Sequence, residues 1–526
     1  MDKTLYSIFH GKNDPNQPAV IVPSSAPIAC TLSYPQLLDT IRDFSSQLNA
    51  LVPGLQPGDA VAISYLNSLE FVVAFLGTGF MRLISAPLNP AYTEDEFNFY
   101  LEDSKAKVMV VPRGAANDKT KNAAIRAAQK QGTVVVEAHW DGKAIDVVAL
   151  ASNKSARSTS RVAPSFGPRP DDVTLLLHTS GTTGRPKGVP LSHINLATSM
   201  RNIIGTYDLS PKDRTYLVMP LFHVHGLVCG LLATLLSGGS VVIPQKFSAS
   251  HFWKDFVDTG CNWYTAVPTI HQILLRNPPS QVPPIRFIRS CSSSLAPATF
   301  KAIEEHFKAP VLEAYAMTEA AHQMTSNPLP SRGVHKPGSV GLGQGVEIVI
   351  LDDKGNPVEE GEVCIRGTNV TRGYLNNPKA TAESFTKDGY FRTGDQGKKD
   401  KDGYLVLTGR IKELINRGGE KISPLELDGV LLSSPGVAEA VSFAVPDPMY
   451  GQEVHAAVVL KDKASKSEAA VERELQAYCQ TKLAKFKVPK RIYVTDIMPK
   501  TATGKIQRRV VSQTFFKEPA PAQAKL

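Results

Sequence analysis

Two hydrophobic periods alternate along the first third of the chain. Apolar residues recur at helical spacing through 34–51 (YPQLLDTIRDFSSQLNAL) and 68–81 (SLEFVVAFLGTGFM). The β-branched runs 60–65 (AVAISY) and 107–112 (KVMVVP) are typical of strands. Because strands that alternate with helices usually form one parallel sheet, we predict α/β layers here. The stretch 152–170 is rich in Ser, Arg and Pro and has little apolar content, which predicts a surface loop.

After residue 340 the pattern changes to short strands and turns. The segments 347–358 and 361–367 predict a hairpin that closes at the turn Asp353 to Pro357. A small all-β subdomain is therefore expected.

After Arg410 the pattern changes again. Strand-like runs at 441–447, 454–460 and 491–496 surround a helical segment at 467–484. We predict a compact α+β domain of about one hundred residues, a usual domain size. At 526 residues the chain is too long for one core, and the predicted division is 1–410 and 411–526.

Charge and cysteine content limit the ligands and the cell compartment that we expect for this protein. Most of the net charge of +9 falls between Lys482 and Arg509, which hold nine Lys or Arg against one acid, Asp496. Such a stretch suits a polyphosphate ligand, and a solvated surface or a nucleic-acid patch would have the same composition. The six cysteines have no CxxC spacing, which favours a reducing compartment without structural zinc. No long apolar run or secretory signal is present, so we expect synthesis in the cytosol and no membrane span.

A glycine- and threonine-rich loop is the first candidate for chemistry. The segment 173–189 is an apolar strand that enters the loop HTSGTTGRPKGV. Glycines let backbone N–H groups converge on an anion, hydroxyls add donors and Lys187 adds positive charge. The spacing differs from the P-loop GxxxxGK[ST], so a standard P-loop NTPase is disfavoured. An ordinary glycine-rich turn is the alternative at this point.

Six motifs in order along the chain favour a phosphate-binding loop over an ordinary glycine-rich turn. They are TSGTTGRPKGV (179–189), PLFHVHGL (220–227), YAMTEA (315–320), YFRTGD (390–395), GRIKELINRGGEKISP (409–424) and PKTATGKIQRR (499–509). Together they resemble the adenylate-forming superfamily of acyl-CoA synthetases, plant coumarate-CoA ligases, firefly luciferases and peptide-synthetase adenylation domains. The resemblance implies an ATP-dependent acid-thiol ligase that forms an acyl-adenylate and then an acyl-CoA thioester.

The resemblance also assigns the nucleotide site. The phosphate ligands would be Thr179, Ser180, Gly181, Thr182, Thr183 and Lys187, and further ATP contacts would come from Ser292, Ser293, Glu313, Ala314, Tyr315 and Ala316. Ala316 stands where the family usually has glycine. Thr318 would contact the α-phosphate, Glu319 would hold Mg²⁺, and Asp395 with Arg410 would bind the ribose hydroxyls. The expected catalytic residues are Lys505, His223, Thr318 and Glu319.

Lys505 matches the lysine that reaches from the C-terminal domain to the α-phosphate and the carboxylate. The two reacting groups are both anionic, so a positioned ammonium lowers their repulsion. Lys412 falls at the hinge on which the resemblance expects a mobile C-terminal lid to turn. Coenzyme A would bind at Lys246 and at the loop residues Gly418, Gly419, Glu420 and Lys421.

The acid pocket carries a polar wall. Its expected members are His223, His225, Ser292, Ser294 and His322. Imidazoles and hydroxyls pair well with a second carboxylate, whereas a fatty or cinnamic acid needs apolar walls. These segments resemble plant oxalate-CoA ligases and fungal peroxisomal CoA synthetases, so oxalate is the expected acid. Short- or medium-chain fatty acids and coumarate-type acids are the alternatives.

The end of the chain predicts a location. Ala524, Lys525 and Leu526 resemble the SKL address, which predicts recognition by the peroxisomal import receptor, with the cytosol as the alternative. Two other functions stay open: an adenylating enzyme that does not use CoA, and a secondary nucleic-acid binder through the basic C-terminal stretch. No nucleic-acid module is recognisable, so the binder ranks below the enzyme.

Overall fold

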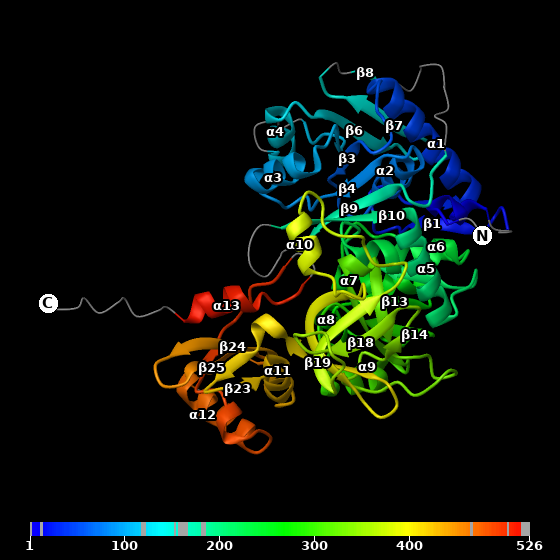
Figure 1. Cartoon of the computed structure of the whole chain (residues 1–526). Coiled ribbons are helices and arrows are strands. Elements are labelled where there is room, and N and C mark those ends of the chain that lie inside the picture. Colours follow the sequence, from blue (N-terminus) through cyan, green and yellow to red (C-terminus); the bar gives the residue numbers. More distant parts are fainter. Residues whose placement is uncertain are drawn as a thin grey trace.

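The structure is a computed structural model that describes residues 3–10, 14–116, 122–151, 154–155, 167–179, 186–462, 467–501 and 504–516. Within these residues the strands form four sheets (Figure 1). Three sheets belong to the large N-terminal region, and the fourth belongs to a smaller C-terminal domain. The predicted class, layered α/β with a β subdomain and an α+β C-terminal domain, is confirmed.

The first sheet is eight-stranded, in the order β10-β9-β4-β3-β5-β6-β7-β8. Its strands are β3 (Ala60–Ile63), β4 (Ile84–Pro87), β5 (Val108–Pro112), β6 (Val134–Trp140), β7 (Ile145–Ala149), β8 (Lys154–Ser155), β9 (Val173–Thr179) and β10 (Lys187–Ser192). The strands from β9 to β6 run parallel, as predicted, while β10 and β7 pair antiparallel with their neighbours. The loop predicted at 152–170 is wrong for residues 154–155, which pair with β7.

The second sheet is nine-stranded, in the order β17-β16-β15-β14-β13-β11-β12-β1-β2. Its strands are β1 (Pro18–Val22), β2 (Cys30–Ser33), β11 (Arg214–Leu217), β12 (Ser240–Val242), β13 (Trp263–Ala266), β14 (Phe287–Ser290), β15 (Val311–Met317), β16 (His322–Ser326) and β17 (Leu342–Gly343). β15 and β16 form a hairpin at one end of the sheet, and their connection carries the YAMTEA motif.

Helices cover both sheets. They are α1 (Tyr34–Leu51), α2 (Leu69–Phe80), α3 (Glu94–Ser104), α4 (Ala123–Lys130), α5 (His193–Tyr207), α6 (Ala233–Leu236), α7 (Ala249–Asp258), α8 (Pro268–Arg276) and α9 (Pro297–Phe307). The helix predicted at 34–51 is confirmed as α1. It begins with Pro35 in its first turn, and the Ser33 amide donates to the Gln36 side chain at 2.8 Å, which satisfies a free helix end.

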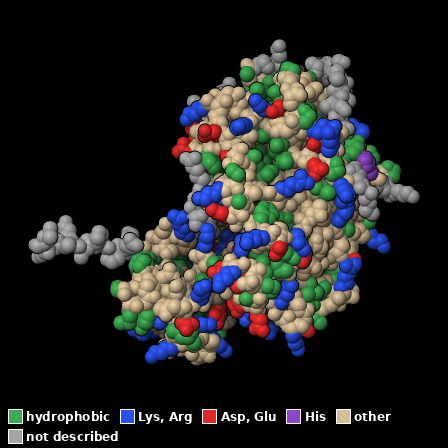
Figure 2. Space-filling model, in the orientation of Figure 1, with side chains coloured by type: hydrophobic (Ala, Val, Ile, Leu, Met, Phe, Trp, Pro, Cys, Tyr) green, Lys and Arg blue, Asp and Glu red, His purple; other side chains and the backbone are tan. Residues whose placement is uncertain are grey.

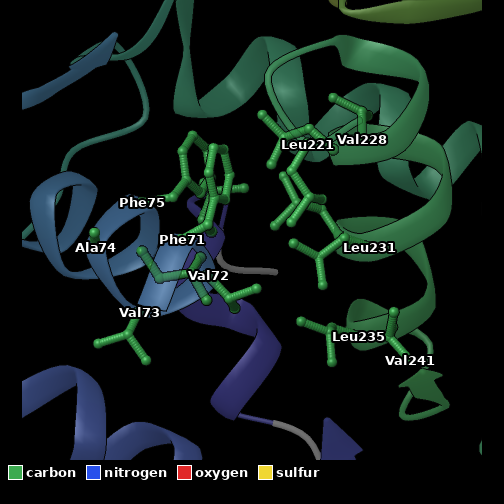
Figure 3. Packing of buried hydrophobic residues seen from close by; sticks show 14 of the residues in the cluster. Phe71, Val72, Val73, Ala74, Phe75, Leu221, Val228, Leu231, Leu235 and Val241 are labelled. Atoms are coloured by element: carbon green, nitrogen blue, oxygen red, sulfur yellow. The ribbon is translucent and has the colours of Figure 1, made fainter. Parts of the chain in front are cut away.

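One shared core joins the two large sheets. Figure 3 shows α2 residues, including Phe71 and Phe75, facing Leu221, Leu231 and Leu235 of the second layer. Each of these side chains is completely buried, and burial of one such side chain contributes roughly 1.5–3 kcal/mol. The nucleotide and acid segments therefore rest on a single rigid base.

The two remaining sheets are smaller. β18 (Glu347–Leu351), β19 (Glu360–Arg366), β20 (Phe391–Lys399) and β21 (Leu405–Arg410) form the β subdomain, with α10 (Pro378–Glu383) between β19 and β20. β22 (Ile415–Arg417), β23 (Glu420–Ile422), β24 (Val437–Asp447), β25 (Gly451–Leu460) and β26 (Arg491–Val494) form the C-terminal sheet, with α11 (Pro424–Leu432), α12 (Glu468–Gln480) and α13 (Arg508–Phe515). The predicted hairpin of 347–367 is confirmed as β18 and β19.

The C-terminal domain forms a lobe beside the β subdomain (Figure 1). α11 contacts β21, and Gly409 lies against Leu414 and Pro424. Among the described residues, no helix has both the length and the apolar content required to cross a membrane.

Candidate active site

A β-hairpin carries the residues predicted to hold the ATP phosphates. β9 ends at Thr179 and β10 begins at Lys187, and these two residues are register partners. The other predicted phosphate ligands, Ser180, Gly181, Thr182 and Thr183, lie outside the described residues. The Lys187 ammonium lies 4.6 Å from the centre of the Tyr374 ring, a cation–π contact that holds the lysine at the base of the hairpin.

Glu319 is a buried carboxylate just after β15, in the single helical turn Thr318–Ala320. Tyr374 donates a 2.9 Å hydrogen bond to Glu319 Oε1, so one tyrosine contacts both Lys187 and Glu319. Burial raises the pKa of Glu319, against the opposing effects of Arg410 and Lys187. The half-buried Thr318 precedes it directly.

The donor set around Glu319 fits Mg²⁺ carried by a nucleotide. The structure, over the residues it describes, has no cluster of three His, Cys, Asp or Glu residues that could form an all-protein metal cage. Mg²⁺ is commonly held by one or two carboxylates together with substrate phosphates and water. A single carboxylate beside the phosphate-binding lysine is therefore a suitable donor.

Asp395 and Arg410, predicted to bind ribose, are brought together by the β subdomain. They are register partners on β20 and β21, and Arg410 Nε lies 3.2 Å from Asp395 Oδ1. The hydroxyl of Tyr315 donates to the other carboxylate oxygen, Oδ2. Burial and the nearby Asp395 charge raise the pKa of Tyr315, so this hydroxyl remains a donor. The carboxylate is held firmly from two sides.

Glu313 has a structural task in the same strand. Its side chain is buried, and Oε2 accepts a 3.0 Å hydrogen bond from the Gly338 amide. Burial raises the pKa of Glu313 to about 7. The carboxylate thus holds the loop at 338 against β15, and the nucleotide contacts predicted for Glu313, Ala314 and Ala316 stay predictions.

Lys505 lies next to the ribose pair although it belongs to the other domain. Its side chain remains exposed within the junction of the two domains. Desolvation by the surrounding protein, together with repulsion from Arg410, lowers the pKa of Lys505, while Glu413 and Asp395 act in the opposite direction. The Gly504 carbonyl accepts a 3.5 Å hydrogen bond from Thr269 of the large region. The C-terminal domain therefore contacts the large region here and places Lys505, the predicted catalytic lysine, near Asp395 and Arg410.

Three residues of the predicted acid wall are linked by direct contacts. His225 Nδ1 lies 3.0 Å from the Ser292 hydroxyl, and the His225 ring stacks on His322 at 5.2 Å with 24° between the planes. Both imidazoles are almost completely buried. Burial and the nearby Arg289 guanidinium lower the pKa of each, so both are neutral at pH 7.

The other predicted wall residues lie on the same two segments. His223 is half-buried beside Phe222, and burial lowers the pKa of His223 to about 4. Ser294 is exposed. The hydroxyl of Ser293, assigned to the nucleotide, is buried and has no hydrogen-bond partner among the described residues.

Arg289 was not predicted and is the main addition from the structure. It lies on β14, is completely buried, and is surrounded by Tyr207, Thr265, His225 and Gln323. In the described part of the chain, no carboxylate lies within ion-pair distance of it. One sequence signal was available: an arginine inside the strand FIRS, directly before the serine run.

Backbone conformation supports a functional site here. Of the eight residues other than glycine that have positive φ among the described residues, three lie at this wall: Ser292 at 72°, Ala321 at 49° and His322 at 103°. Such conformations cost about 1–3 kcal/mol each and cluster at active sites. His225 also begins a π-helical segment, His225–Leu232, and π-helical turns occur frequently at functional sites.

Comparison with known proteins identifies the family. The profile described as AMP-binding enzyme matches residues 10–375, and the profile of the AMP-binding enzyme C-terminal domain matches 426–505. The chain belongs to the AMP-binding enzyme family. It is 54% identical over 480 residues to the oxalate–CoA ligase of Saccharomyces cerevisiae, covering 87% of each chain. It is also 49% identical to the oxalate–CoA ligase of Arabidopsis thaliana, covering 93% of this chain and 94% of that protein.

Solved structures of a similar protein cover nearly the whole chain. ATP-bound MatB from Rhodopseudomonas palustris is 30% identical and superposes with a TM-score of 0.86, covering 98% of this chain and 99% of MatB. Apo MatB covers the same fractions with a TM-score of 0.77. The whole chain therefore superposes better on the ATP-bound form of that protein than on its apo form.

The residues predicted for CoA are all exposed in this AMP-binding enzyme. Gly418 and Gly419, with φ of 60° and 96°, form the exposed turn between β22 and β23, and the Gly418 amide donates to the Tyr450 carbonyl. Glu420, Lys421 and Lys246 are exposed as well. Lys412, the predicted hinge, lies in the exposed helical turn Ile411–Glu413 between β21 and β22.

About half of the basic C-terminal stretch is paired with acids. Five of its nine basic residues pair with acids: Lys487 with Glu426, Lys490 with Asp447, Arg491 with Glu472, Lys500 with Glu439, and Arg508 with Asp428 and Glu413. Figure 2 shows positive and negative side chains interspersed near the junction of the two domains. On the face that Figure 2 shows, acids interrupt the basic side chains, unlike the one-sided basic surface expected of a nucleic-acid binder.

Proposed function

We propose that this AMP-binding enzyme is an oxalate–CoA ligase that converts oxalate, ATP and CoA into oxalyl-CoA, AMP and pyrophosphate. The observation that carries the proposal is the polar acid wall, in which His225, Ser292 and His322 lie over the buried Arg289. A second carboxylate on the acid would pair with the Ser292 hydroxyl and with His322 Nε2, a buried atom that has no partner among the described residues. The names of the yeast and Arabidopsis relatives support the same acid.

In the first half-reaction, an oxygen of the oxalate carboxylate attacks the α-phosphorus of ATP, and the bond to pyrophosphate breaks. The hairpin with Thr179 and Lys187 holds the β- and γ-phosphates, while Thr318 contacts the α-phosphate. Asp395 and Arg410 hold the ribose. The Lys505 ammonium bridges the two anionic groups and lowers their repulsion. Glu319 would hold Mg²⁺ together with the phosphates, and the ion would supply further charge neutralisation.

In the second half-reaction, the CoA sulfur attacks the acyl carbon of the adenylate, and the bond to AMP breaks. We propose that the lid, residues 411–526, turns at Lys412 and brings the Gly418–Lys421 turn to the acyl site, where Lys246 binds CoA phosphate. His223 would line the path of the thiol. An adenylate is a strong acylating agent, so the docked lid must also exclude water.

The alternatives are weaker on physical grounds. A fatty acyl chain or a coumarate ring at this wall would leave the buried His322 Nε2 without a hydrogen-bond partner, which costs about 1–3 kcal/mol. An adenylating enzyme without CoA would release adenylate whether or not CoA is present. The ion pairs of the basic stretch give no support to nucleic-acid binding.

The acid panel is the direct test of the proposal. AMP and pyrophosphate release is measured with ATP, Mg²⁺ and CoA for oxalate, malonate, acetate, hexanoate and coumarate. We expect turnover that selects oxalate and depends on CoA. Preference for hexanoate or coumarate would overturn the acid assignment and keep the enzyme class.

We also propose a peroxisomal location, through the import receptor that reads Ala524, Lys525 and Leu526. These residues lie outside the described part of the chain, so the support is the sequence. A fluorescent protein fused in front of the full chain should enter peroxisomes, and deletion of the three residues should leave it in the cytosol. Import of the truncated fusion would contradict the assignment.

A further inference from the structure

We propose that Arg289 sets the direction of a buried hydrogen-bond relay, Arg289–Thr265–His225–Ser292, so that the Ser292 hydroxyl donates to the second anionic group of the acid. The proposal deepens the oxalate assignment and rests on it. Arg289, Thr265 and His225 are positioning residues, and Ser292 is the residue that touches the substrate.

The relay starts from a cation that can only donate. A guanidinium remains charged and has no acceptor atom. Arg289 lies 3.2 Å from Thr265 Oγ1, 2.8 Å from the Tyr207 hydroxyl, and 3.4 Å from both His225 Nε2 and Gln323 Oε1. The oxygen of Thr265 therefore accepts from Arg289.

The next two bonds follow from this first one. Arg289 also faces His225 Nε2 at 3.4 Å, so this nitrogen is an acceptor, and the Thr265 hydroxyl donates its own proton to it at 2.6 Å. A neutral imidazole carries one proton, so that proton must lie on Nδ1 of His225. Nδ1 then donates to Ser292 Oγ at 3.0 Å. Burial and the Arg289 charge keep the pKa of His225 well below its usual value, which maintains the neutral form.

Ser292 thereby becomes a donor toward the outside of the relay. Its oxygen is occupied as an acceptor from His225, and no other described side chain accepts its proton. The residue is exposed, unlike Thr265 and His225. Its φ of 72° shows that the backbone holds this placement at a cost. The Ser292 hydroxyl therefore has its proton free to donate to an anionic oxygen of the acid.

His322 lies against the same relay. It stacks on His225, and its buried Nε2 has no hydrogen-bond partner among the described residues. A buried polar atom without a partner calls for an explanation such as an absent ligand. A second carboxylate bound next to Ser292 would supply a partner for His322. It would also bring a negative charge near Arg289, whose buried positive charge is costly without a counter-ion.

The test uses Thr265, where shape and hydrogen bonding can be separated. Thr265→Val keeps the volume and removes the relay hydroxyl, whereas Thr265→Ser keeps the hydroxyl. The ratio of kcat/KM for oxalate to that for acetate should fall about tenfold in Thr265→Val, the usual effect of one hydrogen bond to a charged group. Thr265→Ser should restore the ratio. Ser292→Ala should lower the ratio similarly, and Thr265→Val with Ser292→Ala should lower it no further.

A structural readout accompanies the kinetics. In the ¹⁵N spectrum of histidine-labelled full-length enzyme, His225 should show the Nδ1–H tautomer, with its signal assigned by its loss in His225→Gln. An Nε2–H tautomer, or an unchanged selectivity ratio in Thr265→Val, would overturn the relay. If the wild type prefers malonate to oxalate but shows the same Thr265 dependence relative to acetate, the relay stands and the oxalate assignment falls.

Discussion

Gly504 offers a way to separate the two half-reactions. It has a φ of 81° and lies where the lid meets α8, and a Cβ at this position would lie 2.9 Å from Thr269 Oγ1 and 3.4 Å from Val267 Cγ2. Gly504→Ala therefore crowds the docked lid and disturbs the 3.5 Å hydrogen bond from Thr269. Crowding costs about 1 kcal/mol and the hydrogen bond about 0.5–1 kcal/mol.

The sum, about 1–2 kcal/mol, predicts roughly a 5- to 30-fold loss of the docked arrangement. Acid-dependent ATP–pyrophosphate exchange should fall by that factor, while CoA acylation from a prepared acyl-adenylate should change little. Thr269→Ala makes room for the methyl group, so the double variant should recover part of the exchange. Gly451→Ala is the control for backbone strain, since Gly451 has a φ of 75° and nothing within 4 Å of its added Cβ. Equal losses in both half-reactions without recovery would refute the reasoning.

Four further predictions follow from the site and the core. Lys505→Ala should abolish adenylate formation and leave ATP binding measurable by calorimetry; full activity would contradict its role. Because the pKa of Lys505 is lowered, its neutral form appears at lower pH, so the alkaline limb of kcat/KM should lie below 10.5 and be absent in Lys505→Arg. Gly226→Ala should lower the free energy of unfolding in urea by about 2–3 kcal/mol, since its Cβ would lie 2.4 Å from the Pro220 carbonyl, whereas Gly205→Ala has open space. His322→Ala should reduce oxalate turnover more than hexanoate turnover, and equal reductions would refute the polar wall.

Regular elements were predictable because their signals are local. α1 coincides with its apolar period, and the β18–β19 hairpin follows its turn. By contrast, β1 joins the second sheet by pairing with β12, more than two hundred residues along the chain. The sequence pattern of a strand does not determine which other strand it pairs with, so such a long-range pairing could not be predicted.

The candidate site was predictable where a motif carried it. Asp395 and Arg410 come from separate motifs, and the register of β20 and β21 places them side by side. Arg289 was missed because an arginine in one strand is ordinarily read as a surface residue. Its burial depends on Tyr207, Thr265 and Gln323, which come from three other elements. Likewise, the acids that pair with the basic stretch precede it in the C-terminal domain, between Glu413 and Glu472, and only the fold brings them to it.

The most direct test of the central claim is a competition assay. The enzyme is incubated with equimolar oxalate and hexanoate, ATP, Mg²⁺ and limiting CoA. The CoA thioesters are then separated, and the amount of each is measured by mass spectrometry. The account predicts oxalyl-CoA as the dominant product, accompanied by equal amounts of AMP. Hexanoyl-CoA as the dominant product would contradict the acid pocket described for Arg289, His225 and Ser292.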